Sequence, residues 1–153
     1  MAILQVNNLK KGFGSVDVLK GVSFSLEEGQ VLAIIGSSGS GKTTLLRCLN
    51  FLETADEGEI WVKDKPLFVA GTKYTDDQVR ENRLHFGLVF QNFNLFPHYS
   101  VFKSVMEAPI SIQKRDEKEV YEEVKQLLDK VGLADKENAY LSRTIRVEDG
   151  QKV

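Results

Sequence analysis

The chain has 153 residues, enough for one domain of ordinary size, and its 42% hydrophobic and 27% charged residues are typical of a globular protein. Its net charge of −2 gives no basic surface for nucleic acid or anionic lipid, and no apolar stretch reaches the roughly 18 residues of a membrane-spanning helix. Cys48 is the single cysteine, which excludes an internal disulfide and indicates a reducing compartment. We therefore expect no nucleic-acid binding and no direct membrane insertion.

The N-terminal part of the chain is predicted to consist mainly of strands. Residues 3–9 and 18–26 are two candidate strands, separated by a turn over residues 10–15. Because so short a connection joins them, we expect an antiparallel layer. The apolar run of residues 31–35 predicts a further strand over residues 30–35, which leads directly into a glycine-rich segment.

The glycine-rich segment carries the strongest functional signal in the sequence. Gly36, Gly41, Lys42 and Thr43 occupy the fixed positions of the G-x-x-x-x-G-K-[ST] phosphate-binding loop. Glycines allow successive backbone N–H groups to point at an anion, the lysine can reach the outer phosphates, and the threonine hydroxyl can bind Mg²⁺. A strand before the loop and a helix after it favour nucleoside triphosphate binding over the alternative, a surface turn rich in glycine and serine.

The elements after the loop alternate between helix and strand. Residues 44–52 predict an amphipathic helix, and residues 59–62 predict a short strand. Thr75 is a candidate N-cap for a helix that extends to about Leu84. The continuous apolar run over residues 86–90 predicts a strand buried on both faces, as in a parallel sheet.

The C-terminal third is predicted to be helical. One helix covers residues 101–106, and Pro109 is expected to end it. A longer amphipathic helix covers residues 116–131, and Gly132 is expected to stop it. Its apolar face is expected to consist of Val120, Val124, Leu127, Leu128 and Val131.

Four features in chain order resemble one protein family. They are the phosphate loop, an aromatic residue in the first turn (Phe13), a glutamine that ends a buried strand (Gln91), and the segment Phe93-Asn94-Leu95-Phe96-Pro97-His98. With the later Ala108-Pro109-Ile110, they resemble the ATP-binding subunit of ABC transporters, most closely that of the importers for polar amino acids. The resemblance extends from about Ile3 to Tyr140.

The resemblance implies an α/β fold, the P-loop NTPase core of ABC ATPases. We expect an N-terminal antiparallel β layer, a partial parallel sheet and a partial α-helical subdomain. Residues 1–98 would be a partial RecA-like nucleotide-binding core that includes the Q-loop, and residues 99–140 a partial helical subdomain. Residues 141–153 would be an aberrant tail, so that the fold is incomplete at its C-terminus.

The resemblance also implies roles for individual residues around ATP and Mg²⁺. Phe13 would stack on adenine, although a buried turn aromatic is the alternative for this residue. Lys42 would supply charge to the phosphates, and Thr43 and Gln91 would be the two protein ligands of Mg²⁺. The implied nucleotide-binding set is Phe13, Gly36, Ser37, Ser38, Gly39, Ser40, Gly41, Lys42, Thr43 and Thr44.

Partners and location follow from the same resemblance. Residues near Phe93–Tyr99 would dock on transmembrane permease subunits, and a small local core is the equally weighted alternative for this aromatic run. The complete family form is a homodimer. The chain would be cytoplasmic, held at the inner face of the plasma membrane through the permease.

The sequence departs from the family pattern after Tyr140. The family continues with a Leu-Ser-Gly-Gly-Gln signature, whereas here Leu141 and Ser142 are followed by Arg143 and Thr144. The Walker B strand that ends in Asp-Glu and the histidine that senses the γ-phosphate are also absent from the sequence. A chain truncated in this way is expected to bind nucleotide at most. The alternative function is a non-catalytic nucleotide-binding fragment or regulator with no role in transport.

We expect the purified chain to hydrolyse ATP no faster than a Lys42→Ala variant. Phosphoryl transfer depends almost entirely on positioning and charge stabilisation, and the loss of one key group can cost about 10³–10⁵ in rate. Phosphate release from ATP by the two proteins, measured in parallel, checks this expectation. A turnover that depends clearly on Lys42 would contradict it.

Overall fold

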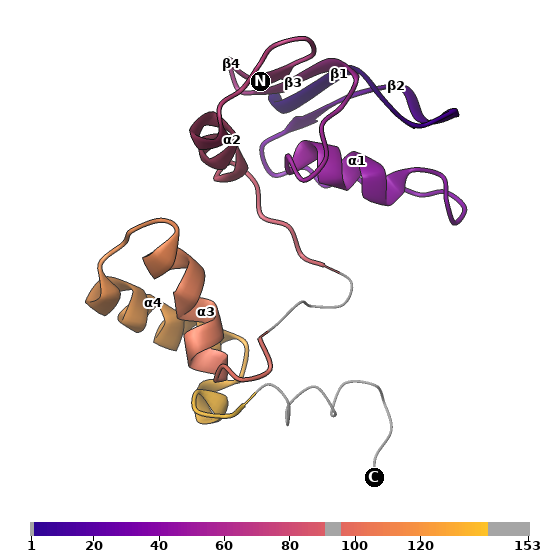
Figure 1. Cartoon of the computed structure of the whole chain (residues 1–153). Coiled ribbons are helices and arrows are strands. Elements are labelled where there is room, and N and C mark those ends of the chain that lie inside the picture. The colour runs from indigo at the N-terminus through magenta and orange to yellow at the C-terminus, as the bar shows by residue number, and fades with distance from the viewer. Residues whose placement is uncertain (1, 91–95, 141–153) are drawn as a thin grey trace. The chain divides into compact units, whose positions relative to one another are not determined.

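The computed structural model describes residues 2–90 and 96–140, and within these ranges the chain forms two compact units (Figure 1). The N-terminal unit covers residues 1–89 and the C-terminal unit covers residues 90–153, a division some residues before the boundary expected at position 98. The expected Mg²⁺ ligand Gln91, the docking residue Phe93 and the expected aberrant tail, residues 141–153, lie outside the described residues.

The N-terminal unit contains a four-stranded antiparallel sheet with the strand order β2-β1-β3-β4. Its strands are β1 (Ala2–Phe13), β2 (Val16–Glu27), β3 (Glu57–Val62) and β4 (Lys65–Val69). This sheet confirms the predicted antiparallel layer and its first strands. The turn expected over residues 10–15 is shorter than predicted, because Lys10–Phe13 continue β1 and pair with β2. Strand β4 was not predicted.

Two helices complete the N-terminal unit. Helix α1 (Lys42–Leu49) follows the glycine-rich segment. It begins two residues before the predicted range of 44–52 and ends three residues before the end of that range. Helix α2 (Asp76–Arg83) begins after the predicted cap. The Thr75 hydroxyl accepts a hydrogen bond from the Gln78 backbone at 3.3 Å, and the Gln78 side chain accepts one from the Thr75 backbone at 2.9 Å. This reciprocal pair is a capping box, which satisfies two otherwise unpaired donors.

The core of this unit lies between the sheet and α1, which runs along one sheet face in Figure 1. Burial of the apolar side chains between the sheet and α1 is the main source of stability available to the unit. Helix α2 is tied to the sheet separately, because the buried Asn82 amide donates a hydrogen bond to the Leu67 carbonyl at 2.7 Å. The buried core residues are Val6, Leu9, Leu19, Leu45, Cys48, Leu49, Ala55, Ile60 and Phe68.

Two strands predicted from apolar runs are wrong. Residues 30–35 and 86–90 are neither helix nor strand, and the side chains of Val31 and Ile35 are 95% and 92% exposed. Among the described residues, no hydrogen bond joins the backbone of residues 31–35 to another group. An apolar run of this kind becomes a strand only beside neighbouring strands, and every strand pair in the described part of the chain is antiparallel. The expected partial parallel sheet is therefore not formed by these residues.

The C-terminal unit is a helical hairpin with its own small core. Helix α3 (Val101–Ser111) is longer than predicted, because Pro109 lies inside its last turn and does not end it. There the missing proline N–H removes a single hydrogen bond. Helix α4 (Glu117–Lys130) confirms the long amphipathic helix, and a short 3₁₀ helix, η1 (Ala134–Lys136), follows it. The core residues are Val101, Met106, Val120, Val124 and Leu128.

The buried face of α4 is narrower than the sequence predicted. Val120, Val124 and Leu128 are buried, whereas Leu127 and Val131 are 43% and 65% exposed. The buried residues recur every four positions, which matches a contact with the single helix α3. Among the described residues, no helix is both long and apolar enough to cross a membrane.

Candidate functional site

The glycine-rich segment forms an exposed loop that leads into the first turn of α1. Gly39 and Gly41 have φ angles of +79° and +92°, a conformation that side chains with a Cβ atom rarely adopt. Gly41 is the N-cap of α1, and no side chain caps the helix. The first N–H groups of α1 are therefore available to a ligand, and the helix dipole favours an anion at this end.

The end of the loop packs closely against strand β2. A Cβ atom on Gly41 would lie 3.0 Å from Val18 Cγ1 and 3.1 Å from the Val18 carbonyl oxygen. Because a side chain at this position would crowd Val18 and would have to adopt a left-handed φ angle, glycine is favoured here by both its backbone angle and its contact with the sheet. The sheet thereby fixes where the phosphate loop ends and α1 begins.

The Lys42 ammonium lies within the loop that precedes it. Its Nζ donates hydrogen bonds to the carbonyl oxygens of Gly36 at 2.8 Å and Ser37 at 2.7 Å, and lies 3.5 Å from Ser40 Oγ. The lysine side chain thus bends back over the loop and does not extend into solvent. This arrangement places a positive charge and the free N–H groups of α1 on the same short segment, which suits a phosphate group.

The expected Mg²⁺ ligands are only partly described. Thr43 is exposed at the start of α1, and no hydrogen bond engages its hydroxyl within the described part of the chain. Gln91 lies outside the described residues, so the structure does not bring the two together. In residues 2–90 and 96–140, no group of three or more His, Cys, Asp or Glu side chains could hold a metal ion. A hydroxyl ligand that leaves most positions to water and phosphate is nevertheless typical of Mg²⁺ at phosphate sites.

Phe13 lies at the turn end of the β1–β2 hairpin, where it pairs with Val16. The residue is 48% exposed, so the alternative of a buried turn aromatic does not apply. The register places it a few residues from Val18, the residue that contacts Gly41. An accessible aromatic face therefore lies on the same hairpin that supports the phosphate loop.

An ion-pair network beneath Phe13 was not found by sequence reasoning. Lys11 Nζ lies 5.2 Å from the centre of the Phe13 ring and 3.1 Å from Asp56 Oδ1. Asp56 also accepts a hydrogen bond from the Gly12 backbone at 2.8 Å. This N–H and the Lys11 ammonium hold the pKa of the Asp56 carboxyl below its usual range. No sequence signal links Lys11 to Asp56, which lie 45 positions apart. The sequence also predicted a turn over residues 10–15, so Lys11 was not expected to lie on a strand.

Aromatic side chains also gather at the start of the C-terminal unit. The Tyr99 ring lies 5.1 Å from Phe96 and 4.8 Å from His98, measured between centroids, and Lys103 Nζ lies 4.2 Å above it. Phe96 is 54% exposed. The rings thus contact one another, as a local core would, while leaving an exposed apolar surface, as a docking site would.

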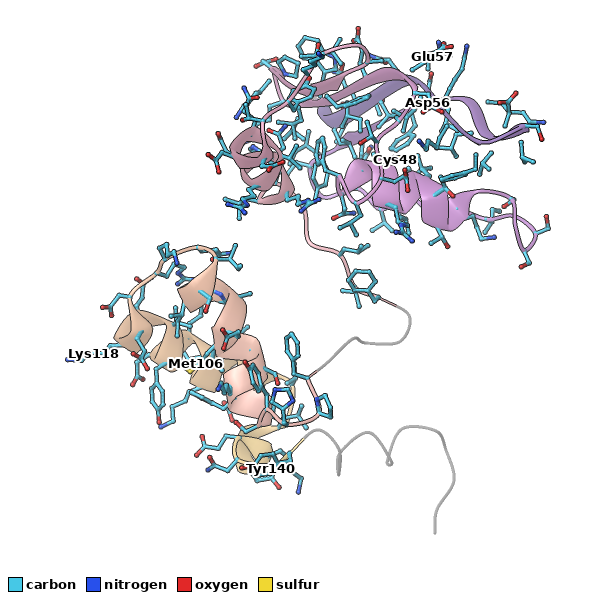
Figure 2. The ribbon with its side chains drawn as sticks, in the orientation of Figure 1. Cys48, Asp56, Glu57, Met106, Lys118 and Tyr140 are labelled. Atoms are coloured by element: carbon cyan, nitrogen blue, oxygen red, sulfur yellow. The ribbon has the colours of Figure 1, made fainter. Side chains whose placement is uncertain are left out.

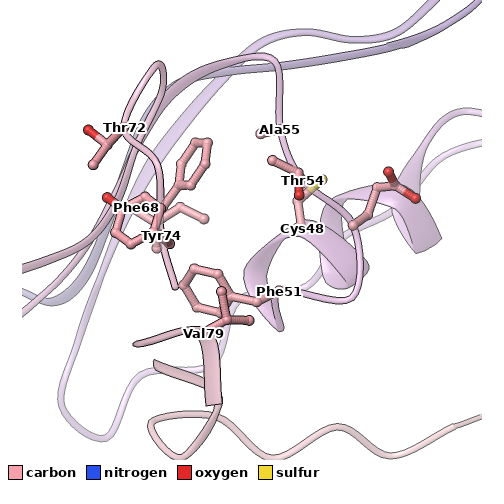
Figure 3. Close-up of a pocket in the computed structure, with 10 residues that line it drawn as sticks. Cys48, Phe51, Thr54, Ala55, Phe68, Thr72, Tyr74 and Val79 are labelled. Carbon is pink, nitrogen blue, oxygen red and sulfur yellow. The ribbon is translucent and has the colours of Figure 1, made fainter. Parts of the chain in front are cut away.

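A cavity of about 260 Å³ lies in the N-terminal unit between the end of α1, the sheet and α2 (Figure 3). Phe51, Phe68 and Tyr74 surround it, and Tyr74 Oη accepts a hydrogen bond from the Val69 backbone at 2.8 Å. Most of its lining is aromatic or aliphatic, with Glu53 as the single carboxylate. Its residues are not those of the phosphate loop, so it forms no part of that site.

Cys48 on the wall of this cavity is expected to react slowly with thiol reagents in the folded chain (Figures 2 and 3). The residue is 2% exposed, and burial raises the pKa of its thiol to about 11. At pH 8 the thiolate fraction should then be at least roughly 100-fold below that of an ordinary cysteine. A disulfide-exchange assay on the native and the urea-unfolded chain measures the rate at which the thiol reacts in each state. Equal rates in the two states would contradict the buried position.

Comparisons with known proteins agree on a single family. The profile of the family described as ABC transporter matches residues 19–153. The L-cystine import ATP-binding protein TcyC of Bacillus subtilis is 47% identical over 139 residues, which are 90% of this chain and 56% of that protein. The arginine transport ATP-binding protein ArtM of the same organism is 43% identical, over 98% of this chain and 59% of its own length. The chain thus spans little more than half the length of the relatives it matches.

Solved structures give the same result for the fold. A structure of cbiO1 from Clostridium perfringens, part of the ABC transporter complex cbiONQ, is similar with a TM-score of 0.75 and 27% identity, covering 91% of this chain and 54% of that one. The ATP-binding cassette MJ0796, solved as a dimer in a post-hydrolysis state with ADP and Pi, has a TM-score of 0.73 and 26% identity, over 90% and 61% of the two chains. Both support an ABC ATPase fold for this chain.

Proposed function

This chain belongs to the ABC transporter family, and from that premise we propose that it binds ATP with Mg²⁺ through the loop of residues 36–44. The observation that carries the proposal is the position of the Lys42 ammonium, which lies over its own loop within hydrogen-bonding distance of the Gly36 and Ser37 carbonyls. The uncapped start of α1 provides backbone donors directly beside it. A cation and free N–H groups on one short segment form a binding site for phosphate.

In this proposal each residue of the site has a distinct role. Lys42 exchanges its two loop carbonyls for oxygens of the outer phosphates, and the N–H groups of Ser37 to Thr44 cradle the phosphate chain. Thr43 and Gln91 bind Mg²⁺, which neutralises phosphate charge when it is present. Phe13 stacks on adenine, a contact of about 1–3 kcal/mol by comparison with aromatic platforms for nucleic-acid bases. Its exposed ring on the hairpin that supports Gly41 favours this role.

We further propose that the chain acts as part of the ATP-binding component of an importer for polar amino acids. Its relatives include ATP-binding proteins of L-cystine import, of arginine transport and of a nopaline permease, and the identities of 42–47% over most of this chain support this branch. The complete form would couple ATP hydrolysis to transport as a homodimer. Its permease partner would contact the aromatic cluster of Phe96, His98 and Tyr99. This contact would hold the chain at the cytoplasmic face of the membrane.

Calorimetric titration of the chain with ATP in the presence of Mg²⁺ tests the first proposal. We expect saturable binding at one site per chain, weakened when Mg²⁺ is replaced by a chelator because the phosphate charge is then less neutralised. An absence of binding heat and of competition with a fluorescent ATP analogue at millimolar nucleotide would overturn the proposal.

A further inference from the structure

The network beneath Phe13 has the geometry of a support for the ring. Strand β1 carries both side chains, two positions apart, at the end of the strand where its pairing with β2 is irregular. The Lys11 side chain is only 12% exposed, although it bears a full charge, whereas the residue Phe13 as a whole is 48% exposed. The ammonium thus lies 5.2 Å from the centroid of a ring that solvent still reaches. A cation on one face of an aromatic ring is attracted by its quadrupole.

The Lys11 ammonium is itself fixed by two carboxylates. It lies 3.1 Å from Asp56 and 3.4 Å from Glu53, both in the segment between α1 and β3. Burial alone would lower the pKa of Lys11, but the contacts with these two carboxylates outweigh burial and raise it. The lysine is therefore fully charged at neutral pH and has little freedom to swing away from the ring.

The backbone strengthens the same connection. The Asp56 N–H donates to the Lys10 carbonyl at 2.9 Å, and Asp56 Oδ2 accepts from the Gly12 N–H at 2.8 Å. Asp56, labelled in Figure 2, lies just ahead of β3, and the pairing of Lys10 with Glu57 places this point beside β1. Because α1 begins at the phosphate loop and ends at Leu49, a few residues before Glu53, one short stretch of chain joins the phosphate site to the support of the ring.

We propose that Lys11 is a positioning residue for nucleotide base binding: clamped by Asp56 and Glu53, it holds one face of Phe13 so that the opposite face is presented to adenine. This inference rests on the proposed ATP site and adds a residue to it. Lys11 does not touch the nucleotide and acts only through the ring. The adjacent Lys10 differs, since its ammonium pairs with Glu57 at 2.7 Å and contacts no ring in the described part of the chain.

The test compares two ligands on the full chain, ATP and inorganic triphosphate, both with Mg²⁺ and both by calorimetry. Lys11→Met keeps the aliphatic stem and removes the charge, Lys11→Arg keeps the charge, and Lys10→Met is the matched control. We expect Lys11→Met to weaken ATP binding by about three- to tenfold while triphosphate affinity is unchanged. Lys11→Arg should retain most of the ATP affinity, and Lys10→Met should alter neither ligand.

The pattern across ligands separates the possible failures. If Lys11→Met loses affinity equally for ATP and triphosphate, Lys11 merely stabilises the fold. If it loses affinity for neither, the ring needs no support. Either result overturns the inference and leaves the proposed phosphate site intact. If the unsubstituted chain binds neither ligand, the proposed function fails and the inference fails with it. The fluorescence of Trp61, the single tryptophan, checks that each variant is folded at the temperature of the titration.

Discussion

Replacement of Ile60 by alanine is expected to lower the free energy of unfolding of the N-terminal unit by about 2–5 kcal/mol. Ile60 is 1% exposed and pairs with Val6 on one side and Phe68 on the other, so the lost methyl and methylene groups leave a cavity in the centre of the sheet. Urea unfolding followed by Trp61 fluorescence measures the change. Alkylation of the buried Cys48 gives an independent probe on α1.

The same substitution at Ile35 is the matched control. This side chain is 92% exposed in a segment that is neither helix nor strand, so Ile35→Ala is expected to change the free energy of unfolding by no more than about 0.5 kcal/mol. The two substitutions remove identical atoms and differ only in their surroundings. A cost at Ile35 as large as that at Ile60 would contradict the structure, because it would mean that residues 30–35 form a buried strand.

Substitution of Lys42 by alanine is expected to weaken ATP binding by roughly 10- to 150-fold. A hydrogen bond to a charged group contributes about 1.5–3 kcal/mol, and here the ammonium would be the single side-chain cation on the phosphates. Calorimetry with Mg²⁺ and ATP measures the loss. Lys118→Ala, at an exposed position on α4 of the other unit, is the control and should leave the affinity unchanged. If Lys42→Ala weakens ATP binding by less than threefold, this lysine does not contribute to the phosphate site.

Local signals in the sequence predicted the elements whose stability is mainly local. Thr75 and Gln78 form the expected cap, and the four-residue spacing of Val120, Val124 and Leu128 predicted α4. A capping box and an amphipathic period depend on residues a few positions apart, so they can be read without knowledge of the fold.

The errors concern elements that depend on distant neighbours. The apolar runs 30–35 and 86–90 have the composition of buried strands, but composition cannot show whether a neighbouring strand is present. Strand β4 was missed because Pro66 near its start reads as a break, whereas a proline is tolerated at the edge of a sheet and β4 lies at that edge.

In the candidate site too, contiguous residues could be predicted from the sequence and contacts between distant residues could not. The phosphate loop is contiguous, so its residues could be named from spacing alone, and the structure adds the direction of the Lys42 side chain. The support of Phe13 by Lys11 and Asp56 required the fold, because those residues meet only when β1 runs beside the segment ahead of β3.

The central claim is that nucleotide phosphates bind at residues 36–44, and an amide NMR titration of the chain with ATP and Mg²⁺ tests it most directly. We expect saturable shifts of the amide resonances of Gly39, Gly41 and Lys42, since their N–H groups would face the phosphates, with inorganic triphosphate reproducing them. The amides of α4, including Glu119, should not move. Shifts that occur elsewhere and leave the loop resonances unchanged at saturating ATP would contradict the claim.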